Sequence, residues 1–360
     1  MKALVTGANG LIGSNLVRAL LARHYDVRGL VRPTSDRRAL EGLDVELAVG
    51  DILDFDSLMD AVEGCDLVFH VAAIFSYSRH GPETLMDTAV TGTNNVLDAA
   101  QEANVRRVVL TSSSVVFGST VAATVLTEAA AAPEADPVPY VLSKIEQEKA
   151  AFRKAGDLNL DIVAVCPTIC VGPHDYGLSE SNAVIINYLN DPFRATWPGG
   201  CNIVAAADVA AGHVQAAERG ASRQRYILGG ENLSWRQIHT MVSAMCGVPG
   251  PLMTATHTSS YLAAAFHEAV SHFTGKRPLV TRDQATMVGR HYWYDHSRAQ
   301  ALGYRPMPGR QALIKAVSWL VTSEHVSAAL RHRMTLADDI YEDRRQEEEK
   351  GNPIHAVQDG

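Results

Sequence analysis

Residues 1–33 read MKALVTGANGLIGSNLVRALLARHYDVRGLVRP, and this stretch decides the fold of the chain. Lys2–Thr6 is a short apolar run of the kind that forms a β-strand. Three glycines follow at three-residue steps, and apolar residues then recur at the spacing of one helix face: Leu16, Val17, Leu20 and Leu21. The pattern predicts a strand, a tight glycine turn and a helix.

The glycine turn has the features of a dinucleotide-binding site. Gly7 allows the sharp turn out of the strand, Gly10 lets the backbone approach a pyrophosphate, and Gly13 lets the helix lie close to the sheet. The N-terminus of the helix offers free N–H groups to the phosphates. A glycine turn that binds nothing is the alternative, and the strand, helix and second strand around it disfavour that interpretation. The predicted cofactor contacts here are Gly7, Asn9, Gly10, Leu11, Ile12 and Gly13.

The end of the second strand, predicted at 25–31, normally selects the cofactor. An acidic residue there would hold a ribose 2′-hydroxyl, whereas an arginine favours a 2′-phosphate. Arg32 follows the strand directly and Arg37 and Arg38 come shortly after it, while Asp36 lies off the strand end. We therefore expect NADP(H) to be preferred over NAD(H), with Arg32 and Arg37 among the contacts. The alternative is that the arginines form a solvated loop.

Length and composition limit the remaining possibilities. The 360 residues, 46% of them hydrophobic, suit one large domain with a smaller lobe. A formal net charge of −8 gives no reason to expect a nucleic-acid partner. The chain has no apolar run as long as a membrane span and no signal peptide before the first strand, so we expect a cytoplasmic protein. Five scattered cysteines predict free, mostly buried thiols, and no metal site is expected.

Strands continue to alternate with helices along the chain, at 45–49, 66–71, 107–110 and 160–165. This spacing predicts an α/β, Rossmann-like, doubly wound parallel sheet. Ligands of such sheets bind beyond the carboxyl ends of the strands. Asp51 is placed to meet an adenine amino group, with a helix N-cap as its alternative role. The further predicted cofactor contacts at strand ends are Ile52, Val71, Ala72, Ala73 and Thr111.

The sequence also suggests a division of the chain. We expect the Rossmann domain over residues 1–173, completed by 203–230. A smaller C-terminal substrate-binding lobe would comprise 174–202 and 231–335, and the charged tail, 336–360, would be flexible. Within the lobe, the stretch 257–273 carries apolar residues at helical spacing, for which we expect ordinary packing rather than a pocket wall or a membrane surface.

Tyr140 and Lys144 lie four residues apart on a predicted helix and so face the same way. A tyrosine with a lysine one turn later can act as an acid–base unit, because a nearby positive charge lowers the pKa of the phenol. The lysine can also hydrogen bond to a ribose. A hydroxyl from the end of the fifth strand, within the run of serines at 112–114, would hold the substrate oxygen. Alone, this spacing is also typical of a surface helix pair; after five strand–helix units it is specific.

Seven segments together resemble one family: TGANGLIG (6–13), GDI (50–52), HVAA (70–73), VTGTNN (90–95), TSSSVVFG (111–118), YVLSK (140–144) and PTICVGP (167–173). Over roughly residues 1–330 the chain is similar to the extended short-chain dehydrogenase/reductase superfamily, in its NAD(P)-dependent epimerase/dehydratase group. The resemblance implies that Ser113, with Ser114 as the alternative, acts with Tyr140 and Lys144. It also implies that Pro167 and Thr168 lie beside the nicotinamide. One departure is Ala89, where the family usually has an asparagine that helps to order this region.

The resemblance extends to a branch of the family. Nucleotide-sugar enzymes use arginines to bind a diphosphate, but here VAVCPTICVGP (163–173) has none, and Cys201 and Ala205 replace an arginine and a histidine. The segments 30–46 and 225–238 look most like the dihydroflavonol-4-reductase-like and 3β-hydroxysteroid dehydrogenase-like branch.

This branch implies an NADP(H)-dependent carbonyl reductase or alcohol dehydrogenase. It would transfer hydride between nicotinamide and a fairly apolar ketone or alcohol, such as a sterol or terpenoid 3-keto or 3-hydroxy group. The alternatives are an NAD-dependent sugar epimerase and a non-catalytic cofactor-binding protein. The expected partner is a small hydrophobic substrate, and the family commonly forms homodimers through a helix pair.

Overall fold

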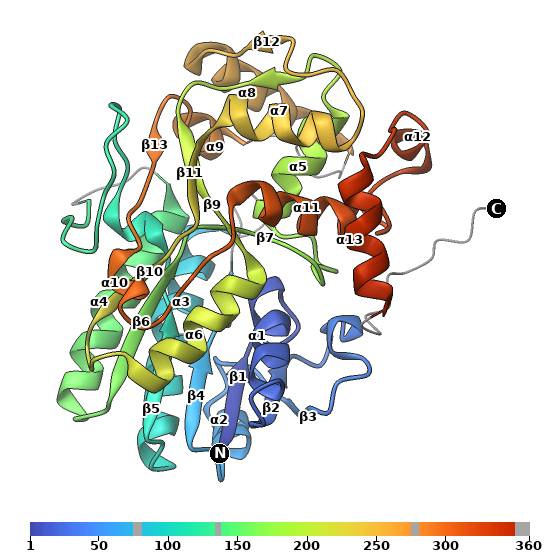
Figure 1. Cartoon of the computed structure of the whole chain (residues 1–360). Coiled ribbons are helices and arrows are strands. Elements are labelled where there is room, and N and C mark those ends of the chain that lie inside the picture. The colour runs from blue at the N-terminus through green and yellow to red at the C-terminus, as the bar shows by residue number, and fades with distance from the viewer. Residues whose placement is uncertain (75–80, 134–137, 275–280, 350–360) are drawn as a thin grey trace.

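The computed structural model describes residues 1–74, 81–133, 138–274 and 281–349. Its centre is a seven-stranded sheet in which every pair of neighbouring strands is parallel, in the order β10-β6-β5-β4-β1-β2-β3 (Figure 1). The predicted α/β, doubly wound sheet is therefore confirmed. Its strands are β1 (Lys2–Thr6), β2 (Asp26–Val31), β3 (Glu46–Val49), β4 (Leu67–His70), β5 (Arg107–Thr111), β6 (Ile162–Pro167) and β10 (Arg225–Leu228).

Helices cover both faces of this sheet, because successive strand residues point to opposite sides. Val5 packs in one apolar cluster with Leu16 and Val209, whereas its neighbour Leu4 packs in another with Val96 and Ala151. The first cluster lies under α1 (Leu11–Leu21) and α6 (Ala206–Arg219). The second lies under α2 (Phe55–Val62), α3 (Pro82–Glu102) and α4 (Pro139–Asp157).

A second layer of structure lies beyond the carboxyl ends of the main strands, at the top of Figure 1. Its sheet has the order β11-β9-β13, with β7 also pairing with β9, and β12 pairs separately with β8. These strands are β7 (Ile169–Val171), β8 (Ala195–Thr196), β9 (Gly200–Ala205), β11 (Glu231–Ser234), β12 (Met253–Thr254) and β13 (His291–Tyr292). Its principal helices are α5 (Glu180–Asn190), α7 (Trp235–Met245) and α11 (Gly309–Leu320).

The remaining elements are short or peripheral: η1 (Arg38–Leu40), η2 (Ser114–Phe117), α8 (His257–Thr274), α9 (Arg282–Thr286), α10 (Ser297–Gln300), α12 (Ala328–Arg331) and α13 (Asp338–Glu349). The sequence showed no clean periodicity where α5 lies. The reason is that polar residues of its first turn are buried: Glu180, Ser181 and Asn182. Asn182 bonds both polar groups of Gly172, so this burial is satisfied by hydrogen bonds rather than by apolar contact.

Part of the charged tail expected over 336–360 is helical in the structure. Residues 338–349 form α13, in which Ile340 is fully buried against the C-terminal lobe. Lys315 of α11 reaches Asp343 at 2.6 Å and Glu347 at 2.9 Å. One buried apolar residue and a set of ion pairs leave no periodic pattern in so charged a sequence, so this helix was hard to predict. Residues 350–360 lie outside the described part of the chain.

The expected packing of α8 is wrong. Leu262 and Phe266 are each 66% exposed and Phe273 is 91% exposed, whereas Ala264 is fully buried. Helical spacing shows that residues share a face but not which face packs, and here the side with the small side chain packs. The five cysteines are free and buried, as predicted. Among the helices of the described residues, none combines the length and apolar character that a membrane crossing requires.

Candidate active site

In the glycine turn, neighbouring backbone segments approach so closely that side chains would not fit. Gly7 has φ +67°, and a Cβ there would lie 2.8 Å from the Cα of Ala72. A Cβ at Gly13 would lie 2.1 Å from the carbonyl oxygen of Gly7, whereas at Gly10 the nearest atom would be 3.5 Å away. Gly10 is also the N-cap of α1 and provides no side-chain cap, so Leu11 and Ile12 begin a helix with free N–H groups. The turn therefore fits a phosphate-bearing cofactor.

The loop after β2 lies next to this turn, since Asn9 Nδ2 donates to the carbonyl of Asp36 at 3.1 Å. Arg38 is held at 2.6 Å by Asp36 and at 2.7 Å by Glu324, and this contact lowers the pKa of Asp36. Arg32 and Arg37 are exposed, and neither forms an ion pair with another described residue. These two arginines are therefore accessible to a ligand bound at the glycine turn.

Asp51 and Ile52 follow β3 at the same edge of the sheet. Asp51 is half-buried and its Oδ1 accepts a hydrogen bond from the N–H of Leu53 at 3.0 Å. The alternative of an N-cap does not hold, because Asp54 caps α2. Ile52 is buried and contacts Gly92 of α3, where any Cβ would clash with it.

The strand ends β4 and β6 bring the next predicted contacts to this edge. The N–H groups of Val71 and Ala72 donate to Thr6 Oγ1, and Ala73 is exposed. Pro167 is the last residue of β6. Thr168 Oγ1 donates to Asn202 Oδ1 at 2.8 Å, which joins the main sheet to the second sheet.

The predicted catalytic residues meet where β5 ends and α4 begins. Ser113 is the N-cap of η2, where its hydroxyl accepts from the N–H of Val115, and it lies close enough to Tyr140 to lower the pKa of that phenol. Lys144, one turn along α4, donates from Nζ to the carbonyl of Thr111 at 3.2 Å and to Gln147 Oε1 at 2.8 Å. Ser113, Tyr140 and Lys144 are all more than nine-tenths buried.

The neighbouring serines point elsewhere. Ser112 donates to Glu148 Oε2 at 2.6 Å. Ser114 lies beside Tyr294 of the second layer, whose hydroxyl donates to the carbonyl of Gly118 at 2.7 Å. Among the three serines, Ser113 is the one that acts on the pKa of Tyr140.

Burial dominates the protonation of the acid–base pair. It raises the pKa of Tyr140 to about 12, against an opposing hydrogen bond from Ser113, and it lowers the pKa of Lys144 to about 8. The expectation that Lys144 would lower the pKa of Tyr140 is wrong in this structure. The reason is that the ammonium donates to Thr111 and Gln147 instead.

A family model described as the NAD dependent epimerase/dehydratase family matches residues 3–229. The chain belongs to this family. The nicotinamide dinucleotide on which this family depends fits the glycine turn and the strand ends described above.

Relatives in the family cover nearly the whole chain. A protein of Synechocystis sp. with the provisional name dihydroflavonol 4-reductase is 35% identical over 89% of this chain and 95% of its own length. Sterol demethylase protein B of Methylococcus capsulatus is 33% identical over 89% of this chain and 98% of its own. The crystal structure of gox2253 is 36% identical, has a TM-score of 0.78, and matches 90% of this chain and 99% of that one.

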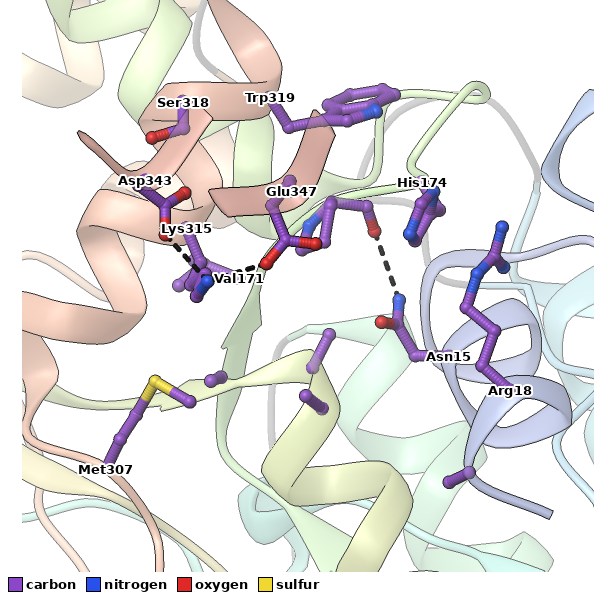
Figure 2. A pocket seen from close by; sticks show the side chains of 15 residues that line it. Asn15, Arg18, Val171, His174, Met307, Lys315, Ser318, Trp319, Asp343 and Glu347 are labelled. Carbon is purple, nitrogen blue, oxygen red and sulfur yellow. Dashed lines mark hydrogen bonds and ion pairs between the residues drawn. The ribbon is translucent and has the colours of Figure 1, made fainter. Parts of the chain in front are cut away.

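One cavity of this epimerase/dehydratase family member has neither Ser113 nor Tyr140 in its lining. Its volume is about 330 Å³, and it is enclosed by α1, α6, α11 and α13 (Figure 2). Its polar groups largely satisfy one another: Lys315 pairs with Asp343 and Glu347, and Asn15 donates to the carbonyl of Pro173. No predicted site residue lines it. Nowhere in the described ranges do three or more His, Cys, Asp or Glu residues gather to hold a metal ion.

Several polar residues around the site were missed by sequence reasoning. They are Thr93, Gln147, Glu148 and Asn202, each of which hydrogen bonds to a predicted site residue or to a residue beside one. The spacing of Gln147, three residues after Lys144 on one helix, was a usable signal. Asn202 carried none, because its contact with Thr168 arises only when the two sheets join.

Proposed function

We propose that this chain is an NADP(H)-dependent oxidoreductase that interconverts a fairly apolar ketone and its alcohol. The observation that carries the proposal is the convergence of the buried residues Ser113, Tyr140 and Lys144 at the carboxyl edge of the main sheet, where Ser113 acts on the pKa of Tyr140 and Lys144 donates to the carbonyl of Thr111. The glycine turn opens at the same edge, as parallel sheets require.

The chemistry divides between the cofactor and the chain. Bound nicotinamide supplies or accepts the hydride at the substrate carbon. Ser113 holds the substrate oxygen by a hydrogen bond, and Tyr140 donates a proton to that oxygen as the carbonyl is reduced. Lys144 donates from its ammonium to the ribose of the cofactor and so holds the cofactor beside Tyr140. In the reverse direction, Tyr140 removes the proton from the alcohol.

The second layer lacks two cationic side chains that would bind a diphosphate, and this supports an apolar substrate. Cys201 and Ala205 stand on β9 where nucleotide-sugar enzymes carry an arginine and a histidine, and both are buried in an apolar cluster. A diphosphate would find no cation from these positions. The relatives named for dihydroflavonol and sterol chemistry point the same way. The exposed side of α8, with Leu262 and Phe266, adds hydrophobic surface to the same lobe.

The test is the absorbance of reduced nicotinamide during incubation with the purified protein. NADPH and NADH would be supplied separately with ketones that include a 3-ketosteroid and a dihydroflavonol, and the oxidised cofactors with the matching alcohols. We expect net turnover on an apolar pair, faster with NADPH, and a loss of about 100-fold or more in Tyr140→Phe, which removes the acid. The variant should still bind cofactor, since its backbone and Lys144 are unchanged.

Two outcomes would count against the proposal. Wild-type rates in Tyr140→Phe would remove Tyr140 from its role. No net turnover by a protein that binds cofactor would favour a sugar epimerase, in which reduced cofactor never accumulates, or a cofactor-binding protein without catalysis; conversion of sugar nucleotides would separate these two.

A further inference from the structure

A buried chain of polar side chains begins at Lys144 and crosses the sheet. Lys144 Nζ contacts Gln147 Oε1 at 2.8 Å, and Gln147 Nε2 contacts Thr93 Oγ1 at 2.9 Å. Thr93 Oγ1 lies 3.0 Å from His70 Nε2, and His70 Nδ1 lies 2.9 Å from Thr6 Oγ1. All five side chains are at most 4% exposed, although they come from four elements, α4, α3, β4 and β1.

At the Thr6 end of this series, the hydrogen positions follow from the number of donors and lone pairs on each side chain. Thr6 Oγ1 accepts hydrogen bonds from the N–H groups of Val71 at 3.1 Å and Ala72 at 3.0 Å, which use both of its lone pairs. Its own hydrogen is then donated to His70 Nδ1. Burial lowers the pKa of His70 to about 3, so the ring is neutral and carries its hydrogen on Nε2, which donates to Thr93.

The hydrogen positions at the near end follow in the same way. An ammonium can only donate, so the oxygen of the Gln147 amide faces Lys144 and its NH₂ group faces Thr93. Thr93 Oγ1 therefore accepts from both His70 and Gln147. Thr93 receives a hydrogen bond from each side, so this series of hydrogen bonds is not a continuous path for a proton. Its role is to hold the five side chains in place.

We propose that Gln147 is a positioning residue for the proposed reaction: it holds the ammonium of Lys144 and ties it, through Thr93 and His70, to the backbone of Val71 and Ala72 along the cofactor. The inference rests on the proposed role of Lys144.

The sequence of α3 agrees with this assignment. Ala89 lies one turn before Thr93 and so shares its helix face, and it lacks the amide that the family usually places there. Gln147 brings an amide to this face from α4 instead.

Substitutions at Gln147 should shift the titration of Lys144 in opposite directions. The other groups that act on the pKa of Lys144 are Cys166 and Glu148, and Glu148 is held by Ser112 and by Arg225. Tyr140 lies one turn away, and His70 is neutral. Gln147→Ala removes an acceptor from the ammonium and should lower the pKa of Lys144 further. Gln147→Glu replaces it with a carboxylate and should raise that pKa.

The experiment is the NADPH dissociation constant, measured by cofactor fluorescence between about pH 6 and pH 10, because this readout needs no substrate. Loss of affinity at high pH, as Lys144 deprotonates, should set in about one pH unit lower in Gln147→Ala and about one unit higher in Gln147→Glu. At pH 8 the Ala variant should bind NADPH about tenfold more weakly. The control is Glu146→Ala at the neighbouring, half-buried position of α4, whose carboxylate pairs with Lys149 rather than with Lys144, and this variant should match wild type.

Thr93→Val provides a second, independent variant, because it removes the acceptor without changing the shape of the side chain. The Thr93→Val and Gln147→Ala effects on NADPH affinity should be less than additive, as expected for residues in one network. Full additivity, or shifts of the same sign in Gln147→Ala and Gln147→Glu, would overturn the inference. If wild type binds NADPH but reduces no ketone, the proposed function fails while these binding results still decide the role of Gln147.

Discussion

Burial acts on the protons of Tyr140 and Lys144 in opposite ways. It raises the pKa of the phenol to about 12 and lowers that of the ammonium to about 8, because in each case the charged form loses solvation. At neutral pH Tyr140 is therefore fully protonated and ready to donate toward a carbonyl oxygen. This state suits the proposed reductive direction, in which a hydrogen bond from Ser113 and the proton from Tyr140 would both reach the substrate oxygen.

The proposed preference for NADPH over NADH also depends on single residues. Arg32→Ala should weaken NADPH binding about tenfold or more, the effect of losing a charge-assisted hydrogen bond, and should change NADH binding by less than about threefold. Arg37→Ala should act in the same direction. Isothermal titration with each cofactor measures this, with the exposed Arg23→Ala as control. Equal weakening for NADH and NADPH would contradict a contact with the 2′-phosphate.

At the scale of elements, α13 is attached to the C-terminal lobe by the apolar side chain of Ile340 and by three acidic residues that pair with α11. Ile340→Ala should lower the free energy of unfolding by about 2–4 kcal/mol, because it leaves a cavity beneath a fully buried position. Tyr341→Ala, at a position 49% exposed on the same helix, is the matched control and should change it by less than about 0.5 kcal/mol. Urea denaturation followed by circular dichroism measures both. Equal midpoints for the two variants would mean that α13 unfolds separately from the lobe.

At the scale of the whole molecule, buried neutral histidines should make the protein sensitive to acid. Burial lowers the pKa of His70, His174 and His239 to about 3 and that of His213 to about 4. In the unfolded chain the same side chains titrate near pH 6.5. Between these values the unfolded state binds more protons, so the free energy of unfolding should fall as the pH drops from about 6.5 toward 4.

Urea denaturation at a series of pH values tests this slope. His239→Phe should make it shallower, since His239 stacks on Tyr188 and its Nε2 has no partner among the described residues. His257→Phe, at an exposed position, should leave the slope unchanged. A slope that is the same in all three proteins would show that other groups govern acid unfolding.

The sequence predicted the main sheet well and the second layer poorly, for one physical reason. Strands buried on both faces and amphipathic helices leave periodic apolar patterns, which is why β1 to β6 were found close to their observed bounds. The strands of the second sheet are short, and β9 pairs with residues far along the chain, so the sequence carries little local pattern for it. The buried polar turn of α5 and the charged helix α13 carry no such pattern.

The sequence by itself determined the fold class, the glycine turn, the family and the set of Ser113, Tyr140 and Lys144, because each depends on residues close together in the chain or on known motifs. Only the tertiary structure decided which serine faces Tyr140, which of the three arginines is already paired, and that Lys144 bonds to Gln147. These outcomes depend on side chains that come from different elements, and on how deeply each is buried. Hydrogen bonding and desolvation across the sheet are not written in any single stretch of sequence.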